Sequence, residues 1–468
     1  MGKITRMAGM LWILLFCLTG LLALPQERAQ DKRKWIDPSK TQTTDDPRRI
    51  PIPPGPRGPE GVIVLRGGRI FDGTGAPVRP GTIVIRRNLI EIILPAGAID
   101  WPKEARVIDV NGKTVMPGLI DAHTHIDYSE PETPAGLDVD EADAMLRAVE
   151  RARFYLECGI TSIRDVGSFH DVPFRLKEWV GQNRVPAPRI FSAGAFITST
   201  GGHGAEGVDP ESPVPTSTRF AEGPDQWRQA VREQFNRGAD LIKIGSHFSR
   251  EEVKAAVEEA HALGLKVACD AETFYIQWAV EAGVDVIEHP LPRTDETIRL
   301  MAQKGTESVP TLVPYAIIFD DWGGYFGSTS RRFTFSKEAN LEVLRRMKRA
   351  GIRMGIGTDL VTNWFRYLPA PYITELKYFV QAGHTIPEAL VAATKTNAEI
   401  LDMSDKLGTL EPGKLADVVV IEGRPDENLD DLAKVDIVIR DGYLVVKGGE
   451  VVIPRHVPIT KLRKATDF

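Results

Sequence analysis

Between residues 117 and 405, short apolar runs alternate with longer segments in which apolar residues recur at helical spacing. The segment EEVKAAVEEAHALG, residues 251–264, is typical of these amphipathic helices. Eight β/α units predict a TIM (β/α)8 barrel, whose chemistry lies at the carboxyl ends of the strands. The runs that we interpret as its strands are GLIDAH, ITSIRD, RIFSAG, DLIKIG, KVACDA, DVIEHP, ESVPTL and RMGIGTD.

A different pattern occupies both ends of the chain. VIVLRGGRIFDGTG (62–75) and GTIVIRRNLIEIIL (81–94) are short β-type runs separated by glycine and proline turns, and GKLADVVVIEG (413–423) returns to this texture near the C-terminus. The sequence therefore predicts an α/β protein in which the barrel, residues 117–405, carries a small accessory β-sandwich domain. Residues 62–116 and 406–468 would together build that domain.

The first residues have the composition of an export signal. Lys3 and Arg6 precede the apolar run 7–23, and polar sequence follows at once. We assign residues 1–24 to a signal peptide; because Leu21 stands where a small residue is preferred for cleavage, an uncleaved membrane anchor is the alternative. Residues 25–61 are polar and then proline-rich, which predicts a disordered linker. We expect an exported protein, periplasmic or extracellular, which meets a membrane only through an uncleaved N-terminal segment.

Composition narrows the partners. The chain has 468 residues, 42% of them hydrophobic, which is ample for a large core. Its formal net charge is -6 and both signs are interspersed, so nucleic acid is not an expected partner. Outside the signal segment only Cys158 and Cys269 remain, too few for a disulfide framework.

Polar side chains suited to metal binding follow several predicted strands. His123 and His125 end the first strand, and residues two apart in a strand point to the same side, so both imidazoles can face one ion. Lys243 ends the fourth strand, where a buried amine is costly unless it is paired or chemically altered. His289 follows the sixth strand and Asp359 the eighth. Each motif is weak alone, but one motif at each strand end predicts a common site.

These motifs resemble those of the amidohydrolase superfamily. The resemblance rests on PGLIDAHTHID, GADLIKIG, AGVDVIEHP, GIGTD and EPGKLADVVVIEG, and it includes TGGHG, residues 200–204. It extends from about Val62 to the C-terminus. Within the superfamily, the chain is most similar to the imidazolonepropionase-like and prolidase-like metal-dependent hydrolases.

The resemblance implies two divalent metal ions, zinc or alternatively manganese. His123, His125 and Asp359 would bind one ion and His289 the other, while Lys243, carboxylated by carbon dioxide, would bridge them. A carbamate offers two anionic oxygens where a protonated amine is a poor ligand. Relatives are often homo-oligomers, so an oligomer is expected here by analogy.

The implied chemistry is hydrolysis by metal-activated hydroxide. Metal lowers the pKa of bound water towards about 7. Asp359 would take the proton from that water and deliver it to the leaving amine. The loop that carries His203 faces the site in the family, so His203 would contact the substrate in the reaction; the alternative is an ordinary turn residue in a glycine-rich loop.

The fifth strand departs from the family pattern. Related chains usually end this strand with a histidine that binds the second ion, whereas this chain has Asp270, and the nearby position that is often tyrosine is Glu272. Three interpretations are open. Asp270 itself is a ligand, since carboxylate oxygen suits zinc and manganese; or His247, four residues after Lys243, replaces the missing histidine; or the second metal site is lost. We favour Asp270 as a ligand. Cys269 is expected to point away, into the barrel wall.

Clues to the substrate are fewer. The loop 315–333 is rich in aromatic residues and glycine and contains Arg331, and Arg366 follows Asp359; either arginine could hold a substrate carboxylate, or be a solvated surface residue. We predict a small-molecule substrate with an amide C–N bond, a dipeptide or an N-acyl amino acid. The alternatives are hydrolysis of a cyclic amide or lactone, and a non-catalytic binding protein with a degenerate metal site.

Overall fold

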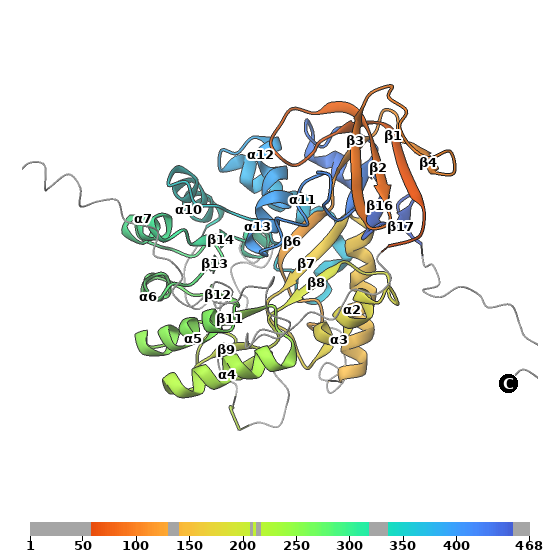
Figure 1. Cartoon of the computed structure of the whole chain (residues 1–468). Coiled ribbons are helices and arrows are strands. Elements are labelled where there is room, and N and C mark those ends of the chain that lie inside the picture. Colours follow the sequence, from red (N-terminus) through yellow and green to blue (C-terminus); the bar gives the residue numbers. More distant parts are fainter. Residues whose placement is uncertain (1–57, 130–139, 206–208, 212–216, 318–335, 453–468) are drawn as a thin grey trace, which may run out of the picture.

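The computed structural model describes residues 58–129, 140–205, 209–211, 217–317 and 336–452 (Figure 1). The predicted signal segment 1–24, most of the linker 25–61 and the residues after 452 lie outside the described part. Within that part no helix has both the length and the apolar character needed to cross a membrane. The fold is α/β, with one sheet built from both ends of the chain and two parallel sheets from its middle.

Strands from the two ends of the chain form a single nine-stranded sheet in the order β18-β17-β16-β15-β5-β1-β2-β3, with β4 beside β1. Antiparallel pairing of β15 with β5 joins the C-terminal strands to the N-terminal ones. Through this pairing, the strands that we assigned to the accessory β-sandwich domain are continuous in one sheet. The strands are β1 (Val62–Ile70), β2 (Arg79–Arg86), β3 (Leu89–Pro95), β4 (Arg106–Asp109), β5 (Thr114–Pro117), β15 (Val418–Ile421), β16 (Val435–Arg440), β17 (Tyr443–Lys447) and β18 (Glu450–Val451).

Alternating residues of this sheet form a core of their own. Ile83 and Ile85 of β2 pack in the same cluster as Val418 and Val420 of β15, all at 0% exposure. Successive side chains of a strand point to opposite faces, so the two-residue spacing puts these pairs on one face. The apolar pattern therefore holds the two ends of the chain together.

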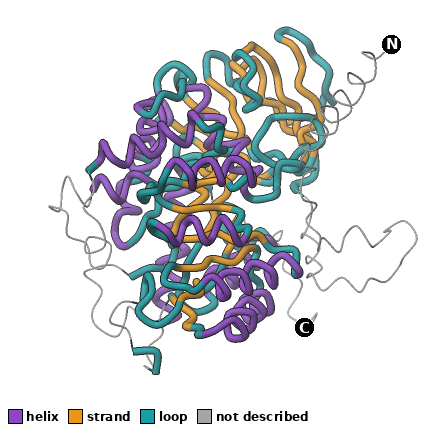
Figure 2. Tube along the Cα trace, turned by 90° about the vertical axis from the view of Figure 1, so that its left-hand side faces the viewer, coloured by secondary structure: helices purple, strands orange, loops and turns teal. Residues whose placement is uncertain are grey.

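The middle of the chain supplies two parallel sheets, β6-β7-β8 and β10-β9-β11-β12-β13-β14, with helices packed around them (Figure 2). Seven of the eight predicted barrel strands are present as strands, and β9 and β10 are additional short ones. The strands are β6 (Leu119–Thr124), β7 (Ile160–Asp165), β8 (Arg189–Ser192), β9 (Phe196–Thr198), β10 (Thr218–Phe220), β11 (Leu241–Gly245), β12 (Lys266–Asp270), β13 (Val286–Glu288) and β14 (Glu307–Val309).

Helix α5 shows how the sequence specifies these helices. Ser249 and Glu252 form a reciprocal capping box at its start, and Val253, Ala256 and Val257 are buried at helical spacing. The helices and helical turns are α2 (Glu141–Glu157), α3 (Val172–Gly181), α4 (Gly223–Arg237), α5 (Arg250–Ala262), α6 (Phe274–Ala282), α7 (Asp295–Lys304), α8 (Leu312–Ala316), α10 (Lys337–Arg349), η3 (Thr362–Tyr367), α11 (Ala370–Gln381), α12 (Ile386–Val391), η4 (Ala392–Thr396), α13 (Asn397–Ile400) and η5 (Leu429–Ala433).

The eighth predicted strand, RMGIGTD, is not a regular strand. It forms only isolated bridges, Ser308 with Met354 on one side and Thr124 with Leu360 on the other. The side chain of Asn397 explains the interruption, because its amide accepts from the Ile356 N–H at 3.0 Å and donates to the Ile356 carbonyl at 2.8 Å. The segment 353–360 still connects β14 to β6.

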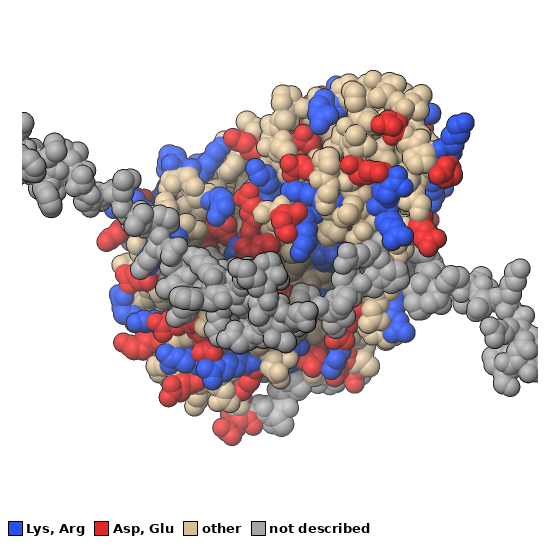
Figure 3. Space-filling model, viewed as in Figure 1, with Lys and Arg blue, Asp and Glu red and all other residues tan. Residues whose placement is uncertain are grey.

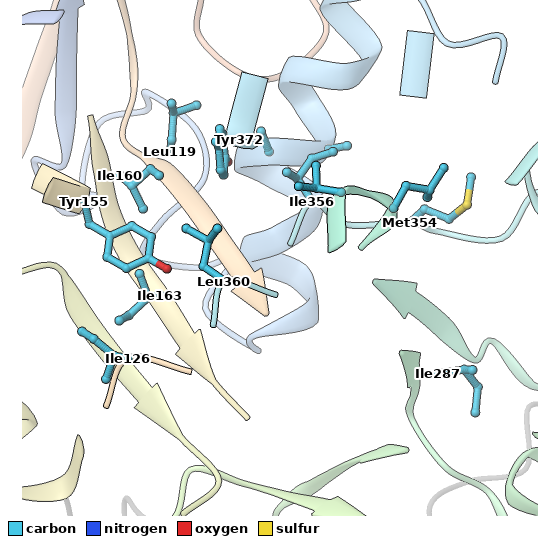
Figure 4. Close-up of a cluster of buried hydrophobic side chains, with 14 of the residues drawn as sticks. Leu119, Ile126, Tyr155, Ile160, Ile163, Ile287, Met354, Ile356, Leu360 and Tyr372 are labelled. Carbon is cyan, nitrogen blue, oxygen red and sulfur yellow. The ribbon is translucent and has the colours of Figure 1, made fainter. Parts of the chain in front are cut away.

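A buried apolar cluster holds β6 and β7 in place (Figure 4). Leu119, Ile160 and Ile163 lie within it, packed with aromatic rings from two helices. The Tyr155 hydroxyl of α2 lies 2.5 Å from the Thr124 hydroxyl, and the Tyr372 hydroxyl of α11 donates to the Ile120 carbonyl at 2.7 Å. These contacts fix the end of β6, from which two histidines project.

Candidate metal centre

His123 and His125 lie at the end of β6 with 0% and 8% exposure. Nδ1 of His123 lies 2.7 Å from Oε2 of Glu288, and Nδ1 of His125 lies 2.8 Å from the Gly167 carbonyl oxygen. A carbonyl can only accept, so Nδ1 of His125 donates to Gly167 and the ring turns its Nε2 toward Asp359. The Glu288 carboxylate orients His123 in the same way, as the outer partners of metal-binding histidines do.

Asp359 brings a carboxylate to these two Nε2 atoms. Its Oδ1 lies 3.2 Å from Nε2 of His125 and 3.4 Å from Nε2 of His123, and its backbone N–H donates to the His123 carbonyl at 2.7 Å. Its φ of 49° is unusual for a residue other than glycine and turns the side chain into the site. Burial acts to raise the pKa of Asp359, but His123, His125 and His289 hold that pKa well below its ordinary range.

The group His123, His125 and Asp359 fits a metal ion. One ligand atom from each lies within 4.8 Å of the others. Nε2 of His123 is buried and has no hydrogen-bond partner in the described part of the chain, and a bound cation would satisfy it. Two imidazole nitrogens and a carboxylate oxygen are ligands that zinc accepts.

Asp270 lies at the end of β12, between two histidines. Its Oδ2 is 2.9 Å from Nε2 of His203 and 3.0 Å from Nε2 of His289. Nδ1 of His289 lies 2.8 Å from the Thr311 hydroxyl, and it is 3.9 Å from Oδ2 of Asp359. Although burial acts to raise the pKa of Asp270, the two histidines hold it well below its ordinary range. The structure thus brings Asp270 and His203 to the predicted site, with His289 between Asp270 and Asp359.

Lys243 lies in the middle of β11 with 3% exposure, paired with Ala268 of β12 two residues before Asp270. Burial and then the charge of Lys243 lower the pKa of His123. Lys243 is therefore close to His123. Cys269 is fully buried in the apolar core, as expected.

Glu288 and Arg164 are buried parts of this site to which the sequence had given no role. Arg164 of β7 donates to Oε1 of Glu288 at 2.7 Å, while Oε2 faces His123. Burial acts to raise the pKa of Glu288, but Arg164, His123 and Lys243 bring it down to about 2. A charged residue within an otherwise apolar run was the sequence sign of both: Arg164 lies in ITSIRD and Glu288 in DVIEHP.

The other predicted residues lie farther out. His247 faces Glu272 in this structure: its Nε2 lies 3.0 Å from Oε1 of Glu272, and its Nδ1 lies 3.1 Å from the Gly201 carbonyl oxygen. Arg366 is an exposed residue of η3. Arg331 lies outside the described residues.

The chain is similar to several known proteins. Residues 114–451 match the model of the Amidohydrolase family. The ochratoxinase of Aspergillus niger is 26% identical over 408 residues, which cover 79% of this chain and 82% of that protein. The imidazolonepropionase of Geobacillus kaustophilus is 25% identical over 425 residues, which cover 82% of this chain and 89% of that protein. A prolidase crystallised with N-methylphosphonate-L-proline is 30% identical, with a TM-score of 0.75, over 82% of this chain and 100% of that one. A Xaa-Pro dipeptidase with bound methionine is 29% identical, with a TM-score of 0.73, over 82% and 99%.

Proposed function

We propose that this chain, which belongs to the amidohydrolase family, cleaves the amide bond of a dipeptide or an N-acyl amino acid. Family membership makes it a hydrolase of C–N bonds, in preference to a non-catalytic binding protein. The observation that carries the proposal is the convergence of Nε2 of His123 and Nε2 of His125 on Asp359. Similarity to a prolidase and to a Xaa-Pro dipeptidase favours a peptide-like amide.

We infer that the parallel strands and the segment 353–360 form a (β/α)8 barrel. Hydrogen bonds link the two parallel sheets on both sides: the Asp240 N–H, just before β11, donates to the Ser192 carbonyl of β8 at 2.8 Å, and the Ala122 N–H of β6 donates to the Ile356 carbonyl at 2.9 Å. The site residues would then lie at the carboxyl ends of the strands, where barrel enzymes carry their chemistry.

His123, His125 and Asp359 would hold one divalent ion, zinc or manganese. Asp270 and His289 would hold a second, with a carboxylated Lys243 between the two ions. When bound, such ions lower the pKa of a coordinated water and polarise the scissile carbonyl.

The residues of the chain have separate tasks in this reaction. Glu288 and the Gly167 carbonyl orient His123 and His125, and Asp359 accepts a proton from the attacking water. As the new C–O bond forms and the C–N bond breaks, Asp359 gives that proton to the leaving nitrogen, so that a free amine and a carboxylic acid result. His203, whose side chain is 26% exposed beside Asp270, would contact the substrate carbonyl.

The substrate is small in this proposal. Basic and acidic side chains are interspersed over the face of the molecule in Figure 3, a pattern that favours a small molecule over a polyanion. Arg366, and Arg331 of the loop outside the described residues, are our candidates for binding a substrate carboxylate. Export of the chain, with residues 1–24 as signal or anchor, is also proposed from the sequence alone.

Metal content and turnover test the proposal together. Protein purified without chelators, with bicarbonate present, is analysed for metal per chain and then incubated with a dipeptide panel and added zinc or manganese. We expect release of free amine from the wild type and not from Asp359→Asn. The proposal fails if no amide in the panel is cleaved with either metal.

Similarity to an imidazolonepropionase supports a second candidate, the opening of a cyclic amide. The products separate the two reactions, because a peptidase releases a free amine as a second molecule, whereas ring opening gives one product of higher mass. Mass spectrometry of the reaction mixture distinguishes them.

A further inference from the structure

A second histidine–carboxylate pair lies beside Asp270, and the proposed chemistry uses neither member. Glu272 follows Asp270 by two residues and is 7% exposed. Its Oε1 lies 3.0 Å from Nε2 of His247, whose Nδ1 lies 3.1 Å from the Gly201 carbonyl oxygen. The Glu272 carboxylate therefore already faces an imidazole nitrogen.

The backbone on both sides of this pair is strained. His247 has a φ of 76°, and Thr273, directly after Glu272, has a φ of 49°. Such values are uncommon for residues other than glycine, and they are most unfavourable for β-branched side chains such as threonine. Conformations of this kind persist where the surrounding structure imposes them, often at ligand sites. Here they keep Glu272 at the end of β12 while the chain turns into α6.

Three aromatic rings on the first turns of α6, which we call the aromatic rim, stand next to the pair. The centroid of Phe274 lies 4.3 Å from that of Tyr275 and 4.9 Å from that of Trp278. The Tyr275 ring lies 5.4 Å from the ring of His247. Phe274 is 51% exposed, so the rim reaches the surface. A carboxylate beside aromatic faces is the combination that binds organic cations.

The position of Glu272 relative to Asp359 indicates which part of a substrate would meet it. Asp270 contacts Nε2 of His289, whereas Asp359 lies toward Nδ1, on the other side of the ring. A leaving amine protonated by Asp359 departs on the Asp359 side. The acyl part then lies on the side of Asp270 and Glu272.

We propose that Glu272 binds a protonated amine on the acyl part of the substrate, with the aromatic rim against the carbon skeleton that carries it. This inference rests on the proposed function, because it uses Asp359 as the proton donor to the leaving group. The ammonium can be the α-ammonium of a dipeptide or one at the end of a side chain. An ion pair with a buried carboxylate favours the charged substrate over an isosteric neutral one.

Three substrates that differ in the ammonium test the proposal. L-Leucyl-L-alanine carries it on the α-carbon, 6-aminohexanoyl-L-alanine carries it at the chain end, and 4-methylpentanoyl-L-alanine has none. We expect kcat/KM for one of the charged substrates to exceed that for the neutral one by about tenfold or more, because charge-assisted hydrogen bonds are the stronger ones. In Glu272→Gln this ratio should fall to near one. The charged substrate that the wild type prefers identifies the position of the ammonium group.

Glu251→Gln is the matched control, since Glu251 is an exposed residue at the start of α5 and the charge change is the same. It should keep the wild-type ratio. Equal kcat/KM for the three substrates, or an unchanged ratio in Glu272→Gln, overturns the proposal. So does a loss of metal from Glu272→Gln, which would make Glu272 a ligand.

If the wild type cleaves none of the three, calorimetry decides the inference separately from the proposed function, which the dipeptide panel tests. Tighter binding of a charged compound to the wild type, lost in Glu272→Gln, supports cation recognition. Equal binding of all three compounds, or no binding, overturns it.

Discussion

Nδ1 of His123 and Oε2 of Glu288 lie 2.7 Å apart, both fully buried, and Arg164 holds the other oxygen of Glu288. The carboxylate fixes the ring orientation of His123 and strengthens Nε2 as a ligand. We expect Glu288→Gln to lower metal affinity by about 10- to 100-fold, the usual effect of removing such an outer partner. Competition with a chromophoric chelator measures this affinity.

Glu307→Gln is a suitable control for that variant. Glu307 is also a buried glutamate at a strand end, paired with Arg353 at 2.9 Å and Lys266 at 3.3 Å, but it begins β14 at the opposite end from the site. It should lose stability and keep its metal affinity. Equal affinity in Glu288→Gln and the wild type would contradict the role assigned to Glu288.

The sequence predicted the candidate ligands and missed the buried partner that orients one of them. His123, His125, Asp270 and Asp359 were found because polar residues break an apolar run where it leaves the core. Glu288 was missed as a partner because nothing local in the sequence shows that it would meet a histidine of another strand, 165 residues away in the chain.

The irregular eighth strand illustrates the same limit. RMGIGTD has a strand-like pattern, and its departure from a regular ladder depends on Asn397, which lies 41 residues after Ile356. The glycines of this segment are the local sign of a close approach, since a Cβ on Gly355 would lie 2.2 Å from Oδ1 of Asn397.

Asn397 should accordingly be essential for stability. Its amide group accepts from the Ile356 N–H and donates to the carbonyl groups of Ile120 and Ile356, all of them buried. Asn397→Leu would leave the Ile356 N–H without a partner, which costs about 1–3 kcal/mol. The two carbonyl groups would each lose one of two hydrogen bonds, because Ile120 keeps the Tyr372 hydroxyl and Ile356 keeps the Ala122 N–H. We expect a loss of about 1–3 kcal/mol in the free energy of unfolding, measured with urea. A loss below about 1 kcal/mol would show that water or backbone groups replace the amide.

Glu375 should make stability depend on pH. It is fully buried on α11, its Oε2 accepts from the Val313 N–H at 2.9 Å, and burial raises its pKa to about 8 from an ordinary value of 4.5. Between these two pH values the folded state keeps a proton that the unfolded chain releases, so this contribution to stability is lost as pH rises from about 4.5 to 8.

Glu375→Gln removes that titration and keeps the shape of the side chain. The wild type loses this contribution as the pH rises from 5 to 8, and the variant does not. The difference in free energy of unfolding between variant and wild type should therefore shift in favour of the variant over this range, by about 3 kcal/mol. Thermal unfolding at both pH values measures the gain, with Glu251→Gln as the exposed control. The same difference between variant and wild type at pH 5 and at pH 8 would mean that Glu375 does not hold its proton in the folded state.

Asp270 is the residue on which the proposed second ion depends. Its carboxylate already bridges His203 and His289, so Asp270→Ala should remove a ligand and leave two imidazoles without their common partner. We expect a large fall in metal content or turnover, and unchanged values of both would exclude Asp270 as a ligand.

Asp270→His restores the residue type that related chains use, and it should keep a working site. Its metal preference should shift from manganese toward zinc, because imidazole suits zinc better than manganese. Metal analysis after loading with an equimolar mixture of the two ions measures that preference.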